Sequence, residues 1–458
     1  MEWLERIGDA LWNPWLLGAF LVVGLICSVQ TGFFQLFGCR VWWQNTVGKL
    51  FRKGKEKTGN GLTPLQTLST ALASTIGTGS IAGVATAIFF GGPGAVFWMW
   101  VSALLGMMTG FVEKTLTIRY RKRVGNQWIG GPMYYMRDGL HLPWMASFFA
   151  LACVCATLAG GNLVQSNSIA SALSATFSIP KIGVGAVVAL LTGVVIFGGI
   201  GRIAGVSEKL VPIMAGLFLA GGGVVLFVCR QAIPGAFQAI LTGAFAPKAA
   251  IAGGAGYTMA AAMRFGIARG VFTNEAGLGS SAMAHAAANV KDPAEQGMWG
   301  MLEVFVATLL VCTVTALVLL TTGVYDPETA LTAIRQGAVD GSMVGAPLSA
   351  AAFSVVLGKG GGILVSVCLV LFAFSSLLGW SYYGEQGLRY LTGSDAWVKR
   401  YRVLFLIIIL VGSVSDVTAV WLLADIFNAL MAAPNLIAIA ILSPQAVRLW
   451  KIKMKKAG

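Results

Sequence analysis

Charged residues are scarce in this chain. Only 11% of its 458 residues are Asp, Glu, Lys or Arg, while 57% are hydrophobic and the mean hydropathy is +0.78. A soluble domain carries about a quarter charged residues, so the composition excludes that class. It predicts an all-α polytopic membrane protein, because a polar backbone can cross lipid only with its hydrogen bonds satisfied internally.

Histidine is almost missing, which excludes several kinds of active site. The two histidines are His141, in a loop, and His285, near a predicted helix end, so we expect no histidine-built metal centre or catalytic triad. Most of the seven cysteines fall inside apolar segments, and Cys153 and Cys155 lack zinc-ligand spacing. With no paired carboxylates, nucleotide loop or soluble domain, a membrane enzyme or sensor has no support. We expect no catalytic residue and no cofactor.

Long apolar runs fill most of the chain. At roughly 20 residues for each crossing, about eleven spans are predicted, near residues 14–38, 63–91, 95–118, 143–177, 182–200, 207–229, 249–288, 297–322, 361–388, 403–415 and 417–446. A shorter apolar segment, 343–357, is expected to be a re-entrant or surface piece. The first span follows Asp9 and has no basic region before it, so we expect it to be retained and not cleaved as a signal peptide.

The net charge is +14, but the positions of the basic residues match the predicted membrane topology and do not indicate a nucleic-acid surface. Most of the 32 basic residues lie on alternate loops, especially 39–60 and 114–137, and on the tail 448–458, whereas the loop 323–342 is acidic. The positive-inside rule places the C-terminus in the cytoplasm. With an odd number of spans, the N-terminus is expected outside.

An interruption stands in the middle of a long uncharged stretch, within the sequence Ser74-Thr-Ile-Gly77-Thr-Gly79-Ser80. Glycines and hydroxyl residues weaken a helix where no water can satisfy the backbone, so such a break lines a cavity or binds something. Close helix packing on the glycines is the alternative. As a solute site, the unwound turn would offer amide hydrogens and the positive end of the following half-helix to an anionic group.

A second interruption is predicted at Arg269–Asn274, followed by Glu275. An ionisable residue at membrane depth is expensive and indicates function by default. Glu275 could instead pair with Arg269 or Arg264 and fix the geometry of the break. Phe272 could be ordinary packing or could cap an apolar side chain of a solute.

The two interruptions suggest internal symmetry. Without the first span, ten remain, and the first helix of each set of five is interrupted. Because five is odd, the two halves face opposite ways, which is the inverted-repeat pattern of secondary transporters. We therefore expect one transmembrane domain, 1–458, with an extra N-terminal helix in 1–40, five-helix repeats in 61–230 and 247–447, and a basic cytoplasmic tail in 448–458.

Two further spans carry polar groups. In 143–177, Asn162 and Gln165 fall on one helix face, where they either bond to neighbouring helices or face a polar solute. In 361–388, Ser375 and Ser376 lie one turn from Trp380. Hydroxyl oxygens are suitable ligands for a small hard cation, although serines inside helices often bond back to their own helix.

Five motifs together are similar to those of one family. They are Gly77-Thr-Gly-Ser-Ile-Ala-Gly-Val-Ala-Thr-Ala-Ile88, Gly91-Gly-Pro-Gly-Ala-Val-Phe-Trp-Met-Trp100, Gly130-Gly-Pro-Met-Tyr-Tyr135, Arg269-Gly-Val-Phe-Thr-Asn-Glu-Ala-Gly-Leu-Gly-Ser280 and Leu378-Gly-Trp-Ser-Tyr-Tyr-Gly-Glu385. Over nearly the whole chain, the sequence resembles the alanine/glycine:cation symporter family. The resemblance implies the fold of the bacterial leucine transporter, sodium-coupled uptake of small neutral amino acids by alternating access, and a prokaryotic plasma membrane.

The resemblance also implies site residues. It places the carboxylate of the solute at Thr78, Gly79 and Ser80, and the rest of the substrate pocket at Gln165, Phe272, Asn274, Ser376 and Trp380. By analogy with the wider fold, sodium would lie between carbonyls of Ala73 and Ile76 and the hydroxyls of Ser375 or Ser376. The expected partners are a small neutral amino acid, Na⁺ or H⁺, and the lipid bilayer, with no obligate protein partner.

The chain departs from the family pattern at two places. The family usually has Asn where Ser80 stands, and often Asp in the stretch occupied here by Val306-Ala307-Thr308. These changes leave the number and identity of the coupling ions open. A proton-coupled carrier of the same fold is the alternative, with protonation of Glu275 in place of a cation.

Overall fold

The computed structural model describes residues 2–12, 14–50, 61–125, 127–245 and 258–457. Two predicted regions lie outside the described residues. They are the basic residues of 51–60 and the first residues of the predicted second repeat, 247–257, which include Lys248. The described chain is almost entirely helical, with one small antiparallel hairpin in which Arg123 pairs with Trp128.

The helices and strands fall into three consecutive parts of the chain. The N-terminal part contains α1 (Glu2–Leu11), α2 (Pro14–Gln30), α3 (Phe34–Phe37), α4 (Cys39–Asn45) and α5 (Val47–Leu50). The next part contains α6 (Pro64–Thr75), η1 (Thr78–Ser80), α7 (Ala82–Gly91), α8 (Gly94–Tyr120), β1 (Lys122–Val124), β2 (Gln127–Ile129), α9 (Pro132–Asp138), α10 (Pro143–Leu158), η2 (Ala159–Leu163), α11 (Val164–Phe177), α12 (Lys181–Ile196), α13 (Gly199–Val228), η3 (Arg230–Ala232) and α14 (Ile233–Phe245). The last part contains α15 (Met259–Asn274), α16 (Ala282–Ala286), α17 (Pro293–Val304), η4 (Phe305–Cys312), α18 (Thr313–Thr321), α19 (Pro327–Gln336), η5 (Gly341–Met343), α20 (Ala346–Leu357), α21 (Lys359–Thr392), α22 (Asp395–Val414) and α23 (Val417–Ala457).

Six helices of the described chain are long and apolar enough to cross a membrane: Gly94–Tyr120, Pro143–Phe177, Gly199–Val228, Pro293–Thr321, Lys359–Thr392 and Ala419–Lys455. Shorter apolar helices are Pro14–Gln30, Ala82–Gly91, Lys181–Ile196 and Ala346–Leu357. The prediction of a polytopic helical membrane protein is thereby confirmed. The number of eleven crossings and the repeat boundaries stay predictions.

Helix α6 begins and ends for local reasons. Pro64 occupies its first turn, and the Thr63 and Gln66 side chains form a capping box that satisfies backbone N–H groups there. The helix ends at Thr75, and the chain passes through Ile76 and extended Gly77 into the short turn η1 before α7 begins. The predicted first interruption is therefore present at the expected residues.

The second interruption lies later than predicted. Helix α15 continues through Arg269–Asn274 and ends where Glu275 adopts a left-handed conformation, with φ of 55°. Gly277 and Gly279 follow with φ of 90° and 80°, conformations that glycine adopts without a Cβ penalty. The break thus spans 275–281. The expectation failed because a single glycine, Gly270, is tolerated inside a helix, whereas three closely spaced left-handed positions are not.

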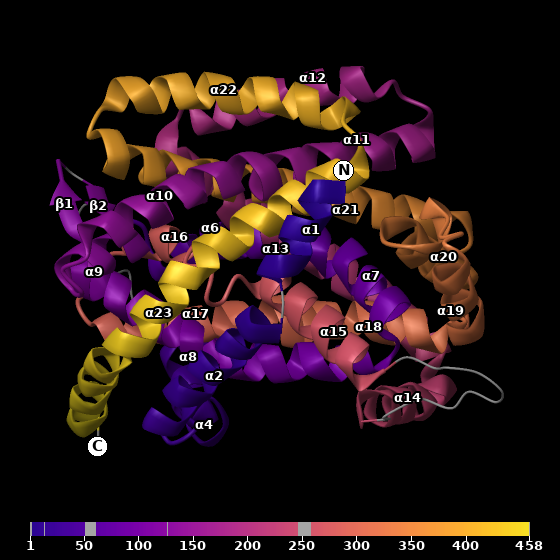
Figure 1. Cartoon of the computed structure of the whole chain (residues 1–458), viewed down its shortest axis with the longest axis horizontal. Helices are drawn as coiled ribbons and strands as arrows, with labels where there is room; N and C mark the ends of the chain where they lie inside the picture. Colours follow the sequence, from indigo (N-terminus) through magenta and orange to yellow (C-terminus); the bar gives the residue numbers. More distant parts are fainter. Residues whose placement is uncertain (1, 13, 51–60, 126, 246–257, 458) are drawn as a thin grey trace.

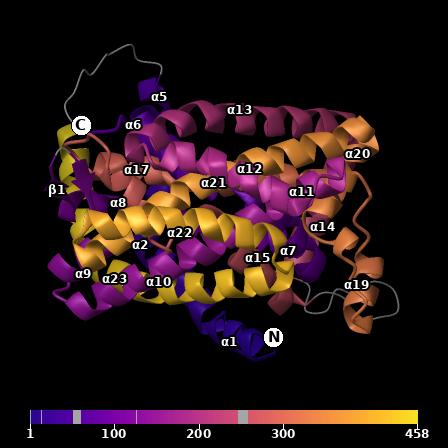
Figure 2. The ribbon, with the colours of Figure 1, turned by 90° about the horizontal axis from the view of Figure 1, so that it is seen from above.

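Figure 1 shows the long helices running side by side across the view. Helices α12 and α22 lie against each other along one edge, next to α10 and α11, while α8 and α15 lie toward the opposite edge. The hairpin, α9 and the C-terminus are at one end of the molecule, and α19 and α20 are at the other. Figure 2, seen from above, shows the same separation of the C-terminus from α19. The interrupted helices α6 and α15 lie between these ends.

Candidate functional site

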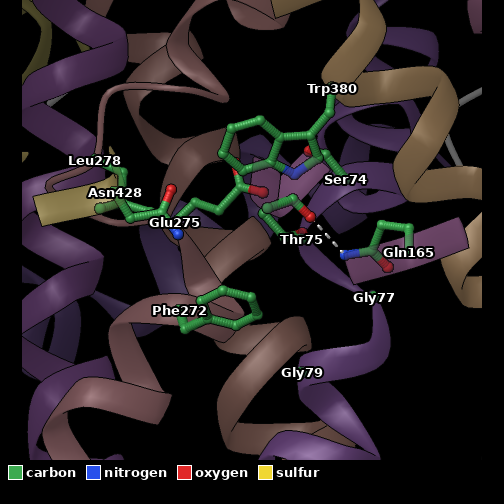
Figure 3. A pocket seen from close by; sticks show the side chains of 11 residues that line it. Ser74, Thr75, Gly77, Gly79, Gln165, Phe272, Glu275, Leu278, Trp380 and Asn428 are labelled. Atoms are coloured by element: carbon green, nitrogen blue, oxygen red, sulfur yellow. Dashed lines mark hydrogen bonds between the residues drawn. The ribbon is translucent and has the colours of Figure 1, made fainter. Parts of the chain in front are cut away.

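A cavity lies where the two interrupted helices meet (Figure 3). It is lined by Ser74, Thr75, Gly77, Gly79, Gly160, Gln165, Phe272, Glu275, Leu278, Trp380 and Asn428. These residues come from the end of α6 and the first break, the π-helical turn η2, the end of α15 with its following loop, and helices α11, α21 and α23. Segments that are distant in sequence therefore converge on one small space.

The first break presents unused backbone donors to this region. The N–H groups of Gly77, Ser80 and Ile81 donate to carbonyls of the same turn. Within the described chain, the N–H groups of Thr78 and Gly79 donate to no hydrogen bond. Buried backbone donors are almost always paired, so two consecutive unpaired ones next to a cavity indicate that a ligand supplies the acceptor.

Glycine is required at two positions of this break by the closeness of its neighbours. A Cβ at Gly77 would lie 2.6 Å from the Ser376 hydroxyl, and a Cβ at Gly79 would lie 2.9 Å from the Thr273 methyl and 3.0 Å from the Phe272 ring. Any side chain there would force the neighbours to move. The glycines therefore bring the backbone itself against the cavity.

Two aromatic side chains limit the cavity. Phe272 and Trp380 both line it (Figure 3). Trp380 is held in place by its packing on Gly161, where an added Cβ would come within 2.5 Å of it. The centre of a water molecule can reach only about 10 Å³ of the cavity, which is space for about one water. A ligand larger than a few atoms must displace one of the rings.

The polar residues of the 143–177 span divide between two roles. Gln165 lines the cavity, with its Nε2 donating to the Gly160 carbonyl at 3.2 Å and its Oε1 left unpaired within the described structure. Asn162 instead donates to the Phe405 carbonyl of α22 at 2.7 Å, and Asn167 donates to Gly412 of the same helix. The expectation that Asn162 and Gln165 share a face is wrong, because the π-helical turn η2 changes the helical phase between them.

Four residues of the predicted pocket, Thr78, Ser80, Asn274 and Ser376, do not line this cavity. Asn274 shapes the break, since its Oδ1 accepts from the Ala276 N–H at 3.0 Å. Ser376 lies behind the first break and donates to the carbonyls of Ala73 and Ser74 at 3.2 and 3.1 Å. Thr78 and Ser80 belong to η1 but are buried beside the cavity, with side-chain hydroxyls that have no partner in the described structure. Of the predicted pocket, Gly79, Gln165, Phe272 and Trp380 line the cavity.

The residues predicted to hold a cation converge on the end of α6. The Ser375 hydroxyl lies 2.9 Å from the Ala73 carbonyl and the Ser376 hydroxyl 3.2 Å from it. Ile76 follows as the last residue before the unwound turn. Carbonyl and hydroxyl oxygens from α6 and α21 are thus brought together without a carboxylate among them. This donor set is of the hard, neutral type that suits a small monovalent ion.

Glu275 lines the cavity and does not pair with Arg269. Its carboxylate accepts from the Ser280 hydroxyl at 2.5 Å. Arg269 lies 3.6 Å from the Asp425 carboxylate, and its guanidinium is 5.0 Å from the centre of the Trp421 ring. Glu275 of the second break and Arg269 of α15 therefore face different surroundings.

A second, larger cavity lies next to Arg269. It is lined by Gly8, Trp12, Arg264, Phe265, Ala268, Arg269, Leu422 and Asp425. The rings of Phe272 and Trp421 pack at an angle of 41° with their centres 5.3 Å apart, and Arg269 packs over both rings. Because Phe272 lines the small cavity and Arg269 lines the large one, these side chains form the partition between the two spaces.

Several lining residues were missed by sequence reasoning. They are Ser74, Thr75, Gly77, Gly160, Leu278 and Asn428, together with Glu275, which was considered as a proton site or as a partner of Arg269 or Arg264. Asn428 could have been noticed as a polar residue in an apolar span, but the sequence does not distinguish it from Asn435 in the same span. Gly160 carried no signal, since only the π-helical turn exposes its backbone to the cavity.

Comparisons with known proteins identify the family and the fold. The model of the Sodium:alanine symporter family matches residues 1–457. Sodium/alanine symporter AgcS of Methanococcus maripaludis is 38% identical over 96% of this chain and 94% of its own length. Putative sodium/proton-dependent alanine carrier protein YrbD of Bacillus subtilis is 34% identical over 100% of this chain and 93% of its own. The crystal structure of MhsT in complex with L-phenylalanine matches with a TM-score of 0.56 at 14% identity, over 85% of this chain and 98% of that one.

The structural match shows a shared transporter fold. The family match and the relatives confirm the resemblance inferred from the motifs, and they indicate a transport protein and not an enzyme. This chain belongs to the sodium:alanine symporter family.

Proposed function

We propose that the protein is a secondary active symporter that couples inward sodium flux to the uptake of small neutral amino acids, alanine or glycine. The observation that carries the proposal is the pair of unpaired N–H groups at Thr78 and Gly79. They lie just before α7, so the positive end of that helix adds to them. A carboxylate would be held there without any arginine.

The rest of the cavity suits the remainder of a small amino acid. The Glu275 carboxylate and the unpaired Oε1 of Gln165 are acceptors for an ammonium group. Because the cavity has space for about one water, even a small amino acid must displace Phe272 or Trp380, and each further carbon of its side chain would require a larger displacement. Since an extra methylene costs about 1–3 kcal/mol when packing must shift, leucine should bind poorly.

The coupling ion is proposed to be sodium, held by the carbonyls of Ala73 and Ile76 and by the hydroxyls of Ser375 and Ser376. Family membership supports sodium, and the convergence of these oxygens at the end of α6 supports the site. An ion there would stabilise the unwound backbone next to the substrate turn. That contact provides a physical link between ion and solute binding.

Transport is proposed to proceed by alternating access between inverted repeats, in a prokaryotic plasma membrane. The chain would have its C-terminus in the cytoplasm and its N-terminus outside. The basic hairpin and tail lie at one end, and α19, which belongs to the acidic loop 323–342, lies at the other, and this separation supports the orientation (Figure 1). A reporter fused at Gly458 that is active only on the outer side would contradict it.

Uptake of labelled alanine into proteoliposomes tests the function. We expect uptake when sodium is supplied outside at equal pH, competition by glycine, and little competition by leucine. Alaninamide should also fail to compete because it lacks the carboxylate. Equal inhibition by leucine and alanine would contradict the small pocket, and inhibition by alaninamide would contradict carboxylate capture at Thr78 and Gly79.

A proton-coupled carrier of the same fold is the second candidate. It is favoured by the buried Glu275 carboxyl in the cavity wall and by Ala307, where the resemblance led us to expect an acid. One relative is named as a putative sodium/proton-dependent alanine carrier. Uptake that follows an imposed proton gradient and ignores sodium would select this candidate, and Glu275→Gln would then abolish it.

A further inference from the structure

A second polar cluster lies buried outside the substrate cavity, and nothing in the proposed transport mechanism uses it. It consists of Glu113 and Lys114 of α8, His285 of α16, and Gln296 and Glu303 of α17, all of them fully or almost fully buried. Burial of so many ionisable groups is costly unless each is paired. The ion pairs and hydrogen bonds of these residues therefore show whether the charges of the cluster are balanced.

The charges of this cluster do not balance. The Lys114 ammonium lies 3.1 Å from one Glu113 oxygen and 3.6 Å from one Glu303 oxygen. Two carboxylates thus share one cation, which leaves one negative charge in excess when His285 is neutral. A proton on His285 would cancel that excess.

The hydrogen bonds of His285 allow both protonation states. Its Nε2 lies 3.1 Å from the Glu303 carboxylate, and its Nδ1 lies 2.6 Å from the Gln296 amide nitrogen. With Gln296 in this orientation the amide donates to Nδ1, so the imidazole is neutral and carries its hydrogen on Nε2. The Oε1 of Gln296 is then buried without a partner in the described structure.

Rotation of the Gln296 amide by half a turn would exchange these roles. The unpaired Oε1 would accept from a protonated Nδ1, while Nε2 continues to donate to Glu303. The proton comes from water and resides on Nδ1, and no hydrogen bond of the imidazole is lost. From this geometry we infer that His285, between Glu303 and the rotatable amide of Gln296, is a proton-binding site of the transporter.

The cluster is connected to the second break, and through it to the substrate cavity. The other oxygen of Glu113 accepts from the Gly277 N–H at 3.0 Å and from Asn435 at 2.7 Å. The charges of Lys114 and Glu303 also act on Glu275, which lines the cavity. A change of charge at His285 therefore reaches the unwound segment 275–281 through electrostatics, and through hydrogen bonds that are joined by the Lys114–Glu303 ion pair.

The charges around His285 determine whether a proton there strengthens or weakens the binding of sodium and substrate. The titratable and charged groups around α16 are Glu113 and Lys114 of α8, Arg121 directly after α8, Glu303 of α17, Glu275 of the break and Tyr383 of α21. A proton added among them makes the potential near Glu275 less negative. Sodium and the substrate ammonium should then bind less tightly, so protons oppose sodium. This direction depends on the sodium-coupled function proposed above, but the existence of the proton site does not.

Nitrogen-15 NMR of histidine-labelled protein tests the site directly, because the chain has only two histidines. His141 is exposed in a loop, and His141→Asn assigns its signal while tolerating the left-handed backbone there. In spectra recorded from about pH 8 to about pH 5, we expect His285 to gain a proton as the pH falls, and to do so at a lower pH when sodium is added. A His285 signal that stays in one protonation state over this range would overturn the proposal, and a titration unaffected by sodium would overturn the link.

Transport provides the second readout. In proteoliposomes with equal pH on both sides, we expect the sodium concentration for half-maximal alanine uptake to rise about 5- to 10-fold from about pH 8 to pH 5.5. His285→Gln keeps a donor and an acceptor but cannot titrate, so its sodium dependence should be flat with pH, whereas His141→Asn should behave like the wild type. The same pH dependence in His285→Gln would overturn the assignment. If His285→Gln fails to fold, the NMR titration decides alone, and absence of sodium-driven uptake beside a normal titration would refute the transport function and not the proton site.

Discussion

Replacement of Gly79 by alanine tests the geometry of the substrate turn most directly. The new Cβ would lie 2.9 Å from the Thr273 methyl and 3.0 Å from the Phe272 ring. Contacts this short require a neighbour to shift, and Phe272 can shift only into or away from the cavity that it lines. The change is therefore expected to act on the ligand site and not on the surface of the protein.

The magnitude follows from the tightness of the packing. Overpacking a close contact by one methyl group costs about 1–3 kcal/mol, and the cavity has space for about one water, so little of this can be relieved. If this overpacking raises the free energy of the ligand-bound state, it corresponds to about a 5- to 150-fold loss of affinity. Alanine should lose more than glycine, because its methyl group needs the space that a displaced Phe272 would take.

Binding of labelled alanine and glycine to purified protein, followed by uptake in proteoliposomes, measures this loss. Gly83→Ala in α7 is the matched control, since its Cβ would meet nothing closer than the flexible Arg269 side chain at 3.9 Å. We expect the control to bind both amino acids normally. Wild-type affinity in Gly79→Ala, or an equal loss in the control, would refute the reasoning.

Three further predictions concern the ion and the partition between the cavities. Ser376→Ala should raise the sodium concentration for half-maximal uptake about 5- to 10-fold, the equivalent of one lost ligand bond of about 1–1.5 kcal/mol, and unchanged sodium dependence would exclude this hydroxyl from the site. Ala307→Asp should tighten sodium dependence, because Ala307 is buried in η4, which packs against the substrate turn η1; an unaltered sodium curve in folded protein would contradict an ion path there. Arg269→Gln should speed the dissociation of bound alanine severalfold, since the partly exposed pair with Asp425 contributes about 1 kcal/mol to the partition, and an unchanged dissociation rate would show that the aromatic rings alone close the cavity.

The amino-acid composition is enough to predict that this is a helical membrane protein. Scarce charge and long apolar runs require a helical membrane protein, because lipid offers no partner for an exposed backbone. The motifs around Gly77 and Asn274 identified the family, and the first break was located correctly because glycines and hydroxyl residues occur together there. The second break was placed too early, since a lone glycine in a helix resembles the start of a break, while the decisive left-handed positions at Glu275 and Gly277 are set by contacts elsewhere.

Which polar side chains face the cavity cannot be predicted from local sequence and depends on how the helices pack. Gln165 and Asn162 are indistinguishable by spacing, yet the π-helical turn directs one to the cavity and the other to α22. Asn274 and Ser376 lie close in sequence to lining residues but form their hydrogen bonds with the backbone. The pairing of Glu303 with both Lys114 and His285 joins three helices, and no local pattern encodes it. Periodicity fixes the direction of a side chain only along a regular helix, and this site is assembled where the helices are irregular.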